Sequence, residues 1–90
     1  GGVAIHTPGH TPGSVSFWFD EYKTLIAGDT LFQGSIGRTD LPGGDFEEIK
    51  KSISERIYSL DDEAVVITGH GPSTRIGLEK QTNNFVRGVN

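Results

Sequence analysis

The chain has 90 residues, enough for one small domain, and it carries a formal net charge of −4 at pH 7. Its eight basic residues are scattered, which disfavours nucleic-acid binding, and the lack of cysteine excludes disulfides, cysteine-ligated zinc and a thiol nucleophile. No apolar run is long enough to cross a membrane and no secretory signal is visible, so we expect a cytoplasmic protein without membrane contacts.

Three strands are predicted in the first third of the chain. Residues 3–5 form a short apolar run, and residues 15–19 (VSFWF) follow the alternating pattern of a half-buried strand. Residues 24–27 resume strand character after a polar break at residues 20–23. The last two strands are therefore predicted to pair as a hairpin.

Residues 33–44 form a long glycine-rich loop, of a kind that often carries function in a compact domain. Its glycines do not match a phosphate-binding loop, because no Gly-Lys-Ser/Thr ends the run. Arg38 is the one long cation in this loop. It either binds an anionic substrate or is solvated, and we favour the second interpretation.

A long helix is predicted after this loop. Asp45 is placed to cap its N-terminus, and Glu48 three residues later approximates a capping box. Spacings of four, four and three residues put one set of apolar side chains on a single helix face. That set is Ile49, Ile53, Ile57 and Leu60.

The last third of the chain contains one predicted strand and one predicted helix. Residues 64–67 are a continuous apolar run, typical of a strand that is covered on both faces. Residues 78–85 are the shorter helix candidate. The order of elements predicts parallel pairing of strands across the long helix, hence an α/β fold.

Three polar residues follow strand-like segments, and each has a glycine immediately before it: His10, Asp29 and His70. Each one alone is also explained as a hydrogen-bonded turn or capping residue. Because α/β sheets gather their sites at strand ends, the three side chains would converge if the strands are neighbours. Two imidazoles and a carboxylate suit zinc or non-haem iron.

Other chemistry is less well supported by the sequence. His6 lies four residues before His10, but Pro8 and Gly9 between them forbid the helix that would align the two rings. We therefore assign His6 to packing or to a supporting hydrogen bond. Ser14 and Ser73 have no histidine partner at a suggestive spacing, which disfavours a serine nucleophile.

Several stretches carry a family resemblance. In their order and spacing, three stretches resemble the later metal-binding motifs of the metallo-β-lactamase superfamily. They are HTPGHTPGS (residues 6–14), IAGDTLF (26–32) and TGHGP (68–72). GSIGRTDLPGGD (34–45) and GPSTRIGLEKQTNNF (71–85) resemble compact bacterial members of its glyoxalase II-like, or hydroxyacylglutathione hydrolase-like, branch. The resemblance covers nearly the whole chain.

The resemblance implies a metal centre and a hydrolytic reaction. His10 resembles the third histidine of the first zinc site, Asp29 the catalytic aspartate that bridges both metals, and His70 the last histidine, a ligand of the second zinc. It implies two zinc ions, with iron as the alternative. It also implies a bridging hydroxide that attacks a small-molecule thioester or a related ester.

The first motif of that family, His-x-His-x-Asp-His, is absent from the sequence. What remains supplies two ligands for each metal, whereas a catalytic zinc normally has three protein ligands. We therefore expect an α/β (α+β) fold that is half of an αββα sandwich, with a mixed sheet and two helices. Residues 1–90 are then the C-terminal portion of a single metallo-β-lactamase-fold domain, inactive by itself.

Two alternatives remain open at this point. In the first, the protein is an iron-dependent persulfide dioxygenase of the same fold, with one iron held by His10 and Asp29. In the second, it is a non-catalytic module that self-associates, because missing strands leave an open sheet edge and an uncovered apolar face. That face is predicted around Phe17, Trp18 and Phe19.

Overall fold

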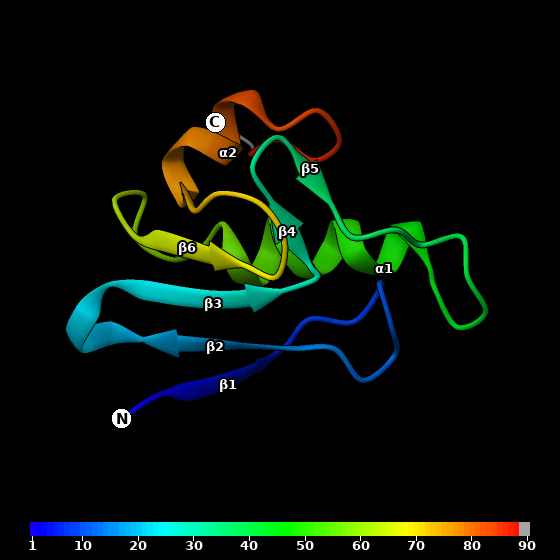
Figure 1. Cartoon of the computed structure of the whole chain (residues 1–90), viewed down its shortest axis with the longest axis horizontal. Coiled ribbons are helices and arrows are strands. Elements are labelled where there is room, and N and C mark those ends of the chain that lie inside the picture. Colours follow the sequence, from blue (N-terminus) through cyan, green and yellow to red (C-terminus); the bar gives the residue numbers. More distant parts are fainter. Residues whose placement is uncertain (89–90) are drawn as a thin grey trace.

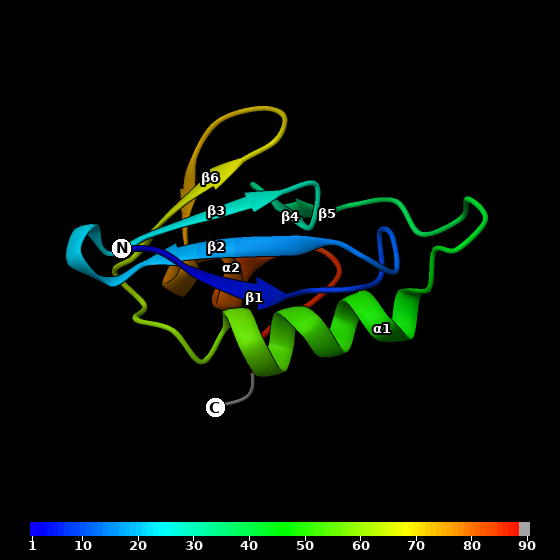
Figure 2. The same ribbon diagram turned by 90° about the horizontal axis from the view of Figure 1, so that it is seen from below.

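The computed structural model describes residues 1–88 and contains a mixed sheet with helices packed on one face, as the sequence predicts (Figures 1 and 2). In spatial order the sheet consists of β1 (Val3–His6), β2 (Val15–Phe19), β3 (Thr24–Gly28), β6 (Val65–Thr68) and β7 (Thr74–Arg75). The predicted hairpin of β2 and β3 and the parallel pairing of β3 with β6 are confirmed.

The remaining elements correct two predictions. The helices are η1 (Asp20–Tyr22), α1 (Phe46–Lys51) with its π-helical continuation η2 (Ser52–Ile57), and α2 (Ile76–Thr82). The segment predicted as a loop contributes to a second, two-stranded sheet of β4 (Leu31–Phe32) and β5 (Ser35–Ile36), and α2 begins and ends earlier than expected. Within residues 1–88 there is no helix with the length and apolarity needed to cross a bilayer.

The long helix forms because both its start and its apolar face agree with the sequence pattern. The Asp45 carboxylate accepts a hydrogen bond from the Glu48 amide at 3.1 Å, which satisfies one free donor of the first turn. Ile49, Ile53 and Ile57 are fully buried in the core. This helix runs along one face of the sheet (Figure 2).

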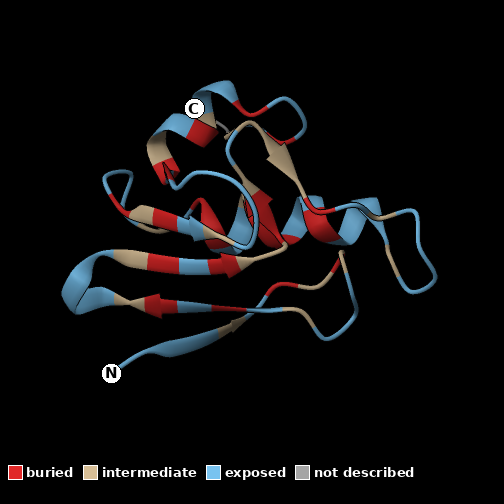
Figure 3. Ribbon diagram, in the orientation of Figure 1, coloured by how far each residue is buried: buried red, intermediate tan, exposed pale blue. Residues whose placement is uncertain are grey.

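The two faces of the sheet differ in what covers them (Figure 3). Trp18, Leu25 and Val66 are register neighbours and belong to the same core cluster as the isoleucines of the long helix. On the opposite face a second row crosses four strands. It consists of Ala4, Phe17, Ile26 and Ile67, all exposed. We call these four residues the open-face row.

Two sequence predictions about this sheet are wrong in detail. Trp18 is only 9% exposed and lies in the core, because side chains alternate along β2 and place it on the helix side. The strand predicted to be covered on both faces has Val66 buried but Ile67 43% exposed. In this chain that strand is covered on one face only.

The open-face row leads to a prediction about the isolated 90-residue chain. Three of its members are large apolar side chains, and such patches promote association. We expect the chain to self-associate, and Phe17→Thr to weaken the association constant by about tenfold or more, since burying one such side chain contributes about 1.5–3 kcal/mol. Sedimentation velocity measures this.

The control for this prediction is Tyr22→Thr. Tyr22 is 72% exposed and lies in η1, outside the sheet. The control should associate like the unmodified chain. A compact monomer at high concentration would contradict the prediction.

Candidate metal centre

Asp29 follows the end of β3 at a break in the regular strand geometry. The register with β6 shifts between Ile26 and Gly28, and Gly28 has φ +54°, a conformation that favours glycine. The Gly69 amide donates to the Gly28 carbonyl at 2.7 Å. The turn that carries Asp29 is therefore bonded directly to the loop that carries His70.

The loop of His10 is held by the N-terminus of α1. Gly9 has φ +140°, and a Cβ at this position would overlap the backbone of Ile49. The Asp45 amide donates to the Gly9 carbonyl at 2.8 Å. Gly13, in the second Thr-Pro-Gly turn, has open space where its Cβ would lie. Only the first of the two glycines is needed for close packing on the helix.

The His10 ring is oriented by a carbonyl from the glycine-rich loop. Its Nδ1 lies 2.8 Å from the Arg38 carbonyl oxygen, so Nδ1 carries the hydrogen and donates. Nε2 faces the Asp29 carboxylate, 3.7 Å from Oδ2. In the neutral ring this leaves a lone pair directed toward a carboxylate oxygen.

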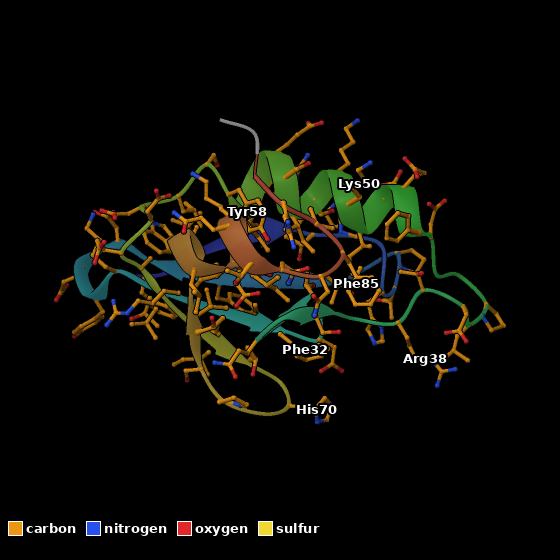
Figure 4. The ribbon with its side chains drawn as sticks, turned by 90° about the horizontal axis from the view of Figure 1, so that it is seen from above. Phe32, Arg38, Lys50, Tyr58, His70 and Phe85 are labelled. Atoms are coloured by element: carbon orange, nitrogen blue, oxygen red, sulfur yellow. The ribbon has the colours of Figure 1, made fainter. Side chains whose placement is uncertain are left out.

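His70 approaches Asp29 from the other side. Its Nε2 lies 3.3 Å from Asp29 Oδ1, and its side chain is 79% exposed. The ring also lies beside Phe32, with 5.9 Å between the ring centroids. Figure 4 shows His70 and Phe32 together, on the opposite side of the molecule from Lys50 and Tyr58. The structure thus places one carboxylate between two imidazoles.

A cluster of buried hydroxyls connects the His10 loop with the Asp29 turn. Thr7 Oγ1 lies 3.0 Å from Ser16 Oγ and 3.4 Å from Thr30 Oγ1. All three residues are almost completely buried. Thr7 precedes the His10 turn and Thr30 directly follows Asp29, so hydrogen bonds join the two segments.

The three predicted ligands line one open pocket of about 330 Å³. The β4–β5 hairpin supplies its wall, through Phe32, Ser35 and Ile36. Gly37 and Arg38 complete the lining. The lining combines polar and apolar side chains, which suits a small ligand with both characters.

Arg38 and His6 take the minor roles that the sequence suggested. The exposed Arg38 guanidinium donates two hydrogen bonds to Asp40, at 2.8 and 2.9 Å, and thereby lowers the pKa of that carboxyl to about 2. His6 Nε2 lies 2.8 Å from the Pro12 carbonyl oxygen, to which it donates, so its ring supports the double turn.

The donor set fits a cation in part. Two atoms bound to one ion at about 2.1 Å each lie no more than about 4.2 Å apart, and both His–Asp pairs meet this limit. Within residues 1–88, however, no group of three or more His, Asp or Glu side chains is arranged to hold a metal ion. Each cation would need further ligands from outside this chain.

The family model described as the metallo-beta-lactamase superfamily matches residues 1–70. The chain belongs to this superfamily. Among curated relatives, hydroxyacylglutathione hydrolase GloC of Haemophilus influenzae is 49% identical over 82 residues, which are 91% of this chain but 39% of GloC.

Solved structures of the superfamily match equally well. The crystal structure of BLEG-1 B3 metallo-beta-lactamase is 48% identical with a TM-score of 0.91, covering 94% of this chain and 41% of that one. TTHA1623 in a di-iron-bound form is 46% identical with a TM-score of 0.92, covering 96% and 43%. The chain therefore spans about two fifths of the length of the superfamily members it matches.

Sequence reasoning missed the pocket wall of this superfamily member. Phe32, Ser35 and Ile36 were part of, or next to, a segment interpreted as loop. The signal that was available is Gly34, the second of two residues between Leu31–Phe32 and Ser35–Ile36, which is typical of a tight hairpin turn. Gly34 has φ +74° in the turn.

A glycine beside the candidate centre allows a direct test of its geometry. A Cβ at Gly69 would overlap Asp29 Oδ1 and lie 2.9 Å from the Gly28 carbonyl oxygen. We expect Gly69→Ala to displace the carboxylate and to lower metal affinity by roughly 10–100-fold, the range typical for disturbing a ligand's support. Metal titration measures this in the complete domain, by which we mean residues 1–90 together with the part of the domain that the matched relatives have and this chain does not contain. Gly13→Ala is the matched control. Equal affinities in both variants would contradict the prediction.

Proposed function

We propose that residues 1–90 are the C-terminal portion of a metal-dependent hydrolase domain that acts on thioesters of the hydroxyacylglutathione type. The observation that carries the proposal is the Asp29 carboxylate between His10 Nε2 and His70 Nε2, at 3.7 and 3.3 Å. The 49% identity with a hydroxyacylglutathione hydrolase supports the choice of substrate class. Superfamily membership supports a hydrolase in general.

In this proposal His10, Asp29 and His70 would hold the metal ions, and the Asp29 carboxylate would be available to both. Bound metal would supply a water of lowered pKa and would stabilise the negative charge that develops on a carbonyl oxygen during hydrolysis. The Arg38 carbonyl keeps the His10 Nε2 lone pair directed into the site. Phe32 and Ile36 offer an apolar surface to the substrate.

The remaining ligands would come from the part of the domain that the relatives have and this chain does not contain. Residues 1–90 together with that part are the complete domain named above. The isolated chain is then expected to bind metal weakly and to be inactive, because two protein ligands are fewer than a catalytic zinc needs.

The test is elemental analysis of the purified complete domain together with hydrolysis of a hydroxyacyl thioester of glutathione. We expect about two metal ions per domain, loss of activity on chelation, and recovery when zinc is added back. A fully active metal-free protein would contradict the proposal.

Iron is the competing metal. Imidazole and carboxylate donors accept it, and TTHA1623 was solved in a di-iron-bound form. Iron in the purified protein, with persulfide-dependent oxygen uptake and no thioester hydrolysis, would show that the protein is a persulfide dioxygenase and not a hydrolase.

A further inference from the structure

The β4–β5 hairpin that forms the pocket wall has little support of its own. Each strand has two residues, and in the described part of the chain, residues 1–88, the hairpin pairs with no strand of the main sheet. A two-stranded hairpin of this size is marginal in water. Its position beside His10, Asp29 and His70 must therefore be set by contacts from other elements.

Glu79, from α2, contacts the turn of this hairpin. Its Oε1 accepts a hydrogen bond from the Gly34 amide at 2.9 Å. Its Oε2 accepts from the Thr74 hydroxyl at 2.6 Å, on β7. One carboxylate thus bonds α2 to the hairpin and to the edge strand of the main sheet.

Two asparagines complete the connection. The Asn83 side-chain amide donates to the Ser35 carbonyl at 3.0 Å and to Glu79 Oε1 at 2.9 Å. The Asn84 side-chain amide donates to the Gly34 carbonyl at 2.9 Å. The Gly34 amide, the Gly34 carbonyl and the Ser35 carbonyl are therefore all bonded to α2 or to the two residues that follow it.

The burial of Glu79 indicates that its hydrogen bonds hold neighbouring groups in position. Glu79 is 1% exposed and Asn83 is fully buried, and within residues 1–88 no basic side chain forms an ion pair with Glu79. Burial raises the pKa of the nearby Tyr58 phenol, and the Glu79 charge raises it further. A buried carboxylate without a cation is a poor source of stability compared with an apolar side chain of similar volume. What it provides instead is three directed acceptor contacts.

We propose that Glu79 and Asn83 are positioning residues of the hydrolase, holding the β4–β5 hairpin so that Phe32, Ser35 and Ile36 form the substrate wall of the metal site. The inference rests on the proposed function for the reaction, and on the hydrogen bonds above for the residues. Glu79 and Asn83 do not touch the pocket themselves. They act through the hairpin.

The test compares Glu79→Ala with Glu79→Gln in the metal-loaded complete domain. Glutamine keeps an acceptor for the Gly34 amide, whereas alanine leaves buried donors without a partner. We expect Glu79→Ala to raise KM for the thioester by about tenfold with metal content unchanged and kcat changed much less. Glu79→Gln should restore KM to within about threefold of the unmodified domain.

Two further variants separate positioning from general destabilisation. Asn84→Ala removes one exposed bond to the hairpin turn and should raise KM by a smaller factor, even if Glu79→Ala does not fold. Thr82→Ala is the control, because within residues 1–88 the Thr82 hydroxyl donates only to the Leu78 carbonyl of the same helix. Equal KM values in Asn84→Ala and Thr82→Ala, or equal losses in both Glu79 variants, would overturn the inference.

Hydrogen exchange at the Gly34 amide distinguishes this inference from the proposed function. The measurement needs no substrate. Faster exchange in Asn84→Ala than in Thr82→Ala supports the positioning role. If the same domain has no hydrolytic activity, the proposed reaction is wrong and the positioning role still holds. Unchanged exchange in every variant would overturn the positioning role itself.

Discussion

Replacing Asp29 by alanine in the complete domain is expected to remove both metal binding and thioester hydrolysis. The Asp29 carboxylate lies within 4 Å of both the His10 and the His70 imidazole nitrogens, so its loss affects the ligand set of either ion. We expect metal affinity and kcat/KM to fall by more than the roughly 10–100-fold that follows loss of an outer partner. Elemental analysis and steady-state kinetics measure the two quantities.

Matched variants define the cause of this effect. Asp29→Asn keeps the shape of the side chain and removes its charge, so it should lie between alanine and the unmodified domain. Asp20→Asn removes an exposed carboxylate that is paired with Lys23 at 3.0 Å, beyond the opposite end of β3. Asp20→Asn should leave metal affinity and kcat/KM unchanged. Unaltered metal content and rate in Asp29→Ala would exclude the proposed centre.

The second large effect is expected at Gly9. Alanine there must adopt φ +140° and place its Cβ against the backbone of Ile49. Overpacking and backbone strain together predict a loss of about 2–5 kcal/mol in the free energy of unfolding. Because His10 is the next residue, metal affinity should fall as well. Urea unfolding of the complete domain measures the first and metal titration the second.

The same loop provides the control for this prediction. Gly13→Ala makes the same chemical change in the other Thr-Pro-Gly turn, where nothing lies within 4 Å of the new Cβ. We expect a change of less than about 0.5 kcal/mol, as for surface substitutions in general. If both variants unfold at the same urea concentration, the close packing of Gly9 on α1 is not what holds this loop.

The spacing of apolar residues predicted most of the helices and strands, because this spacing follows the local geometry of the backbone. The isoleucines of the long helix recur at helical spacing and are all buried. β2 and β3 were recognisable as a hairpin from two apolar segments around a polar break. Parallel pairing of β3 with β6 followed from the helix between them.

The faces of the strands were harder to predict, for a physical reason. Residues 17–19 are all aromatic, so alternation alone does not show which side chain points to the core. The polar residue Ser16 lies on the buried face together with Trp18, and its hydroxyl has a hydrogen-bond partner there in Thr7. A contact between distant segments leaves no signal in the sequence of β2 itself.

The end of α2 shows a similar limit. The predicted helix continues to Phe85, but in the structure α2 ends at Thr82, with Asn83 as its C-cap. The Asn83 side-chain oxygen accepts from the amides of Phe85 and Val86, which offers the backbone an alternative to the helix. The convergence of His10, Asp29 and His70 on one pocket was an expectation from strand order, and their role as ligands remains a proposal.

The buried hydroxyls of Thr7, Ser16 and Thr30 give the connection between the His10 loop and the Asp29 turn a polarity that can change direction. A hydroxyl group both donates and accepts, so the direction of such a chain can reverse by rotation of O–H bonds alone. The hydroxyl dipoles between these two segments can therefore reorient when the charge on a neighbouring group changes, without displacement of the oxygen atoms. Replacing any of the three by an apolar residue of equal size would keep the shape and interrupt this chain.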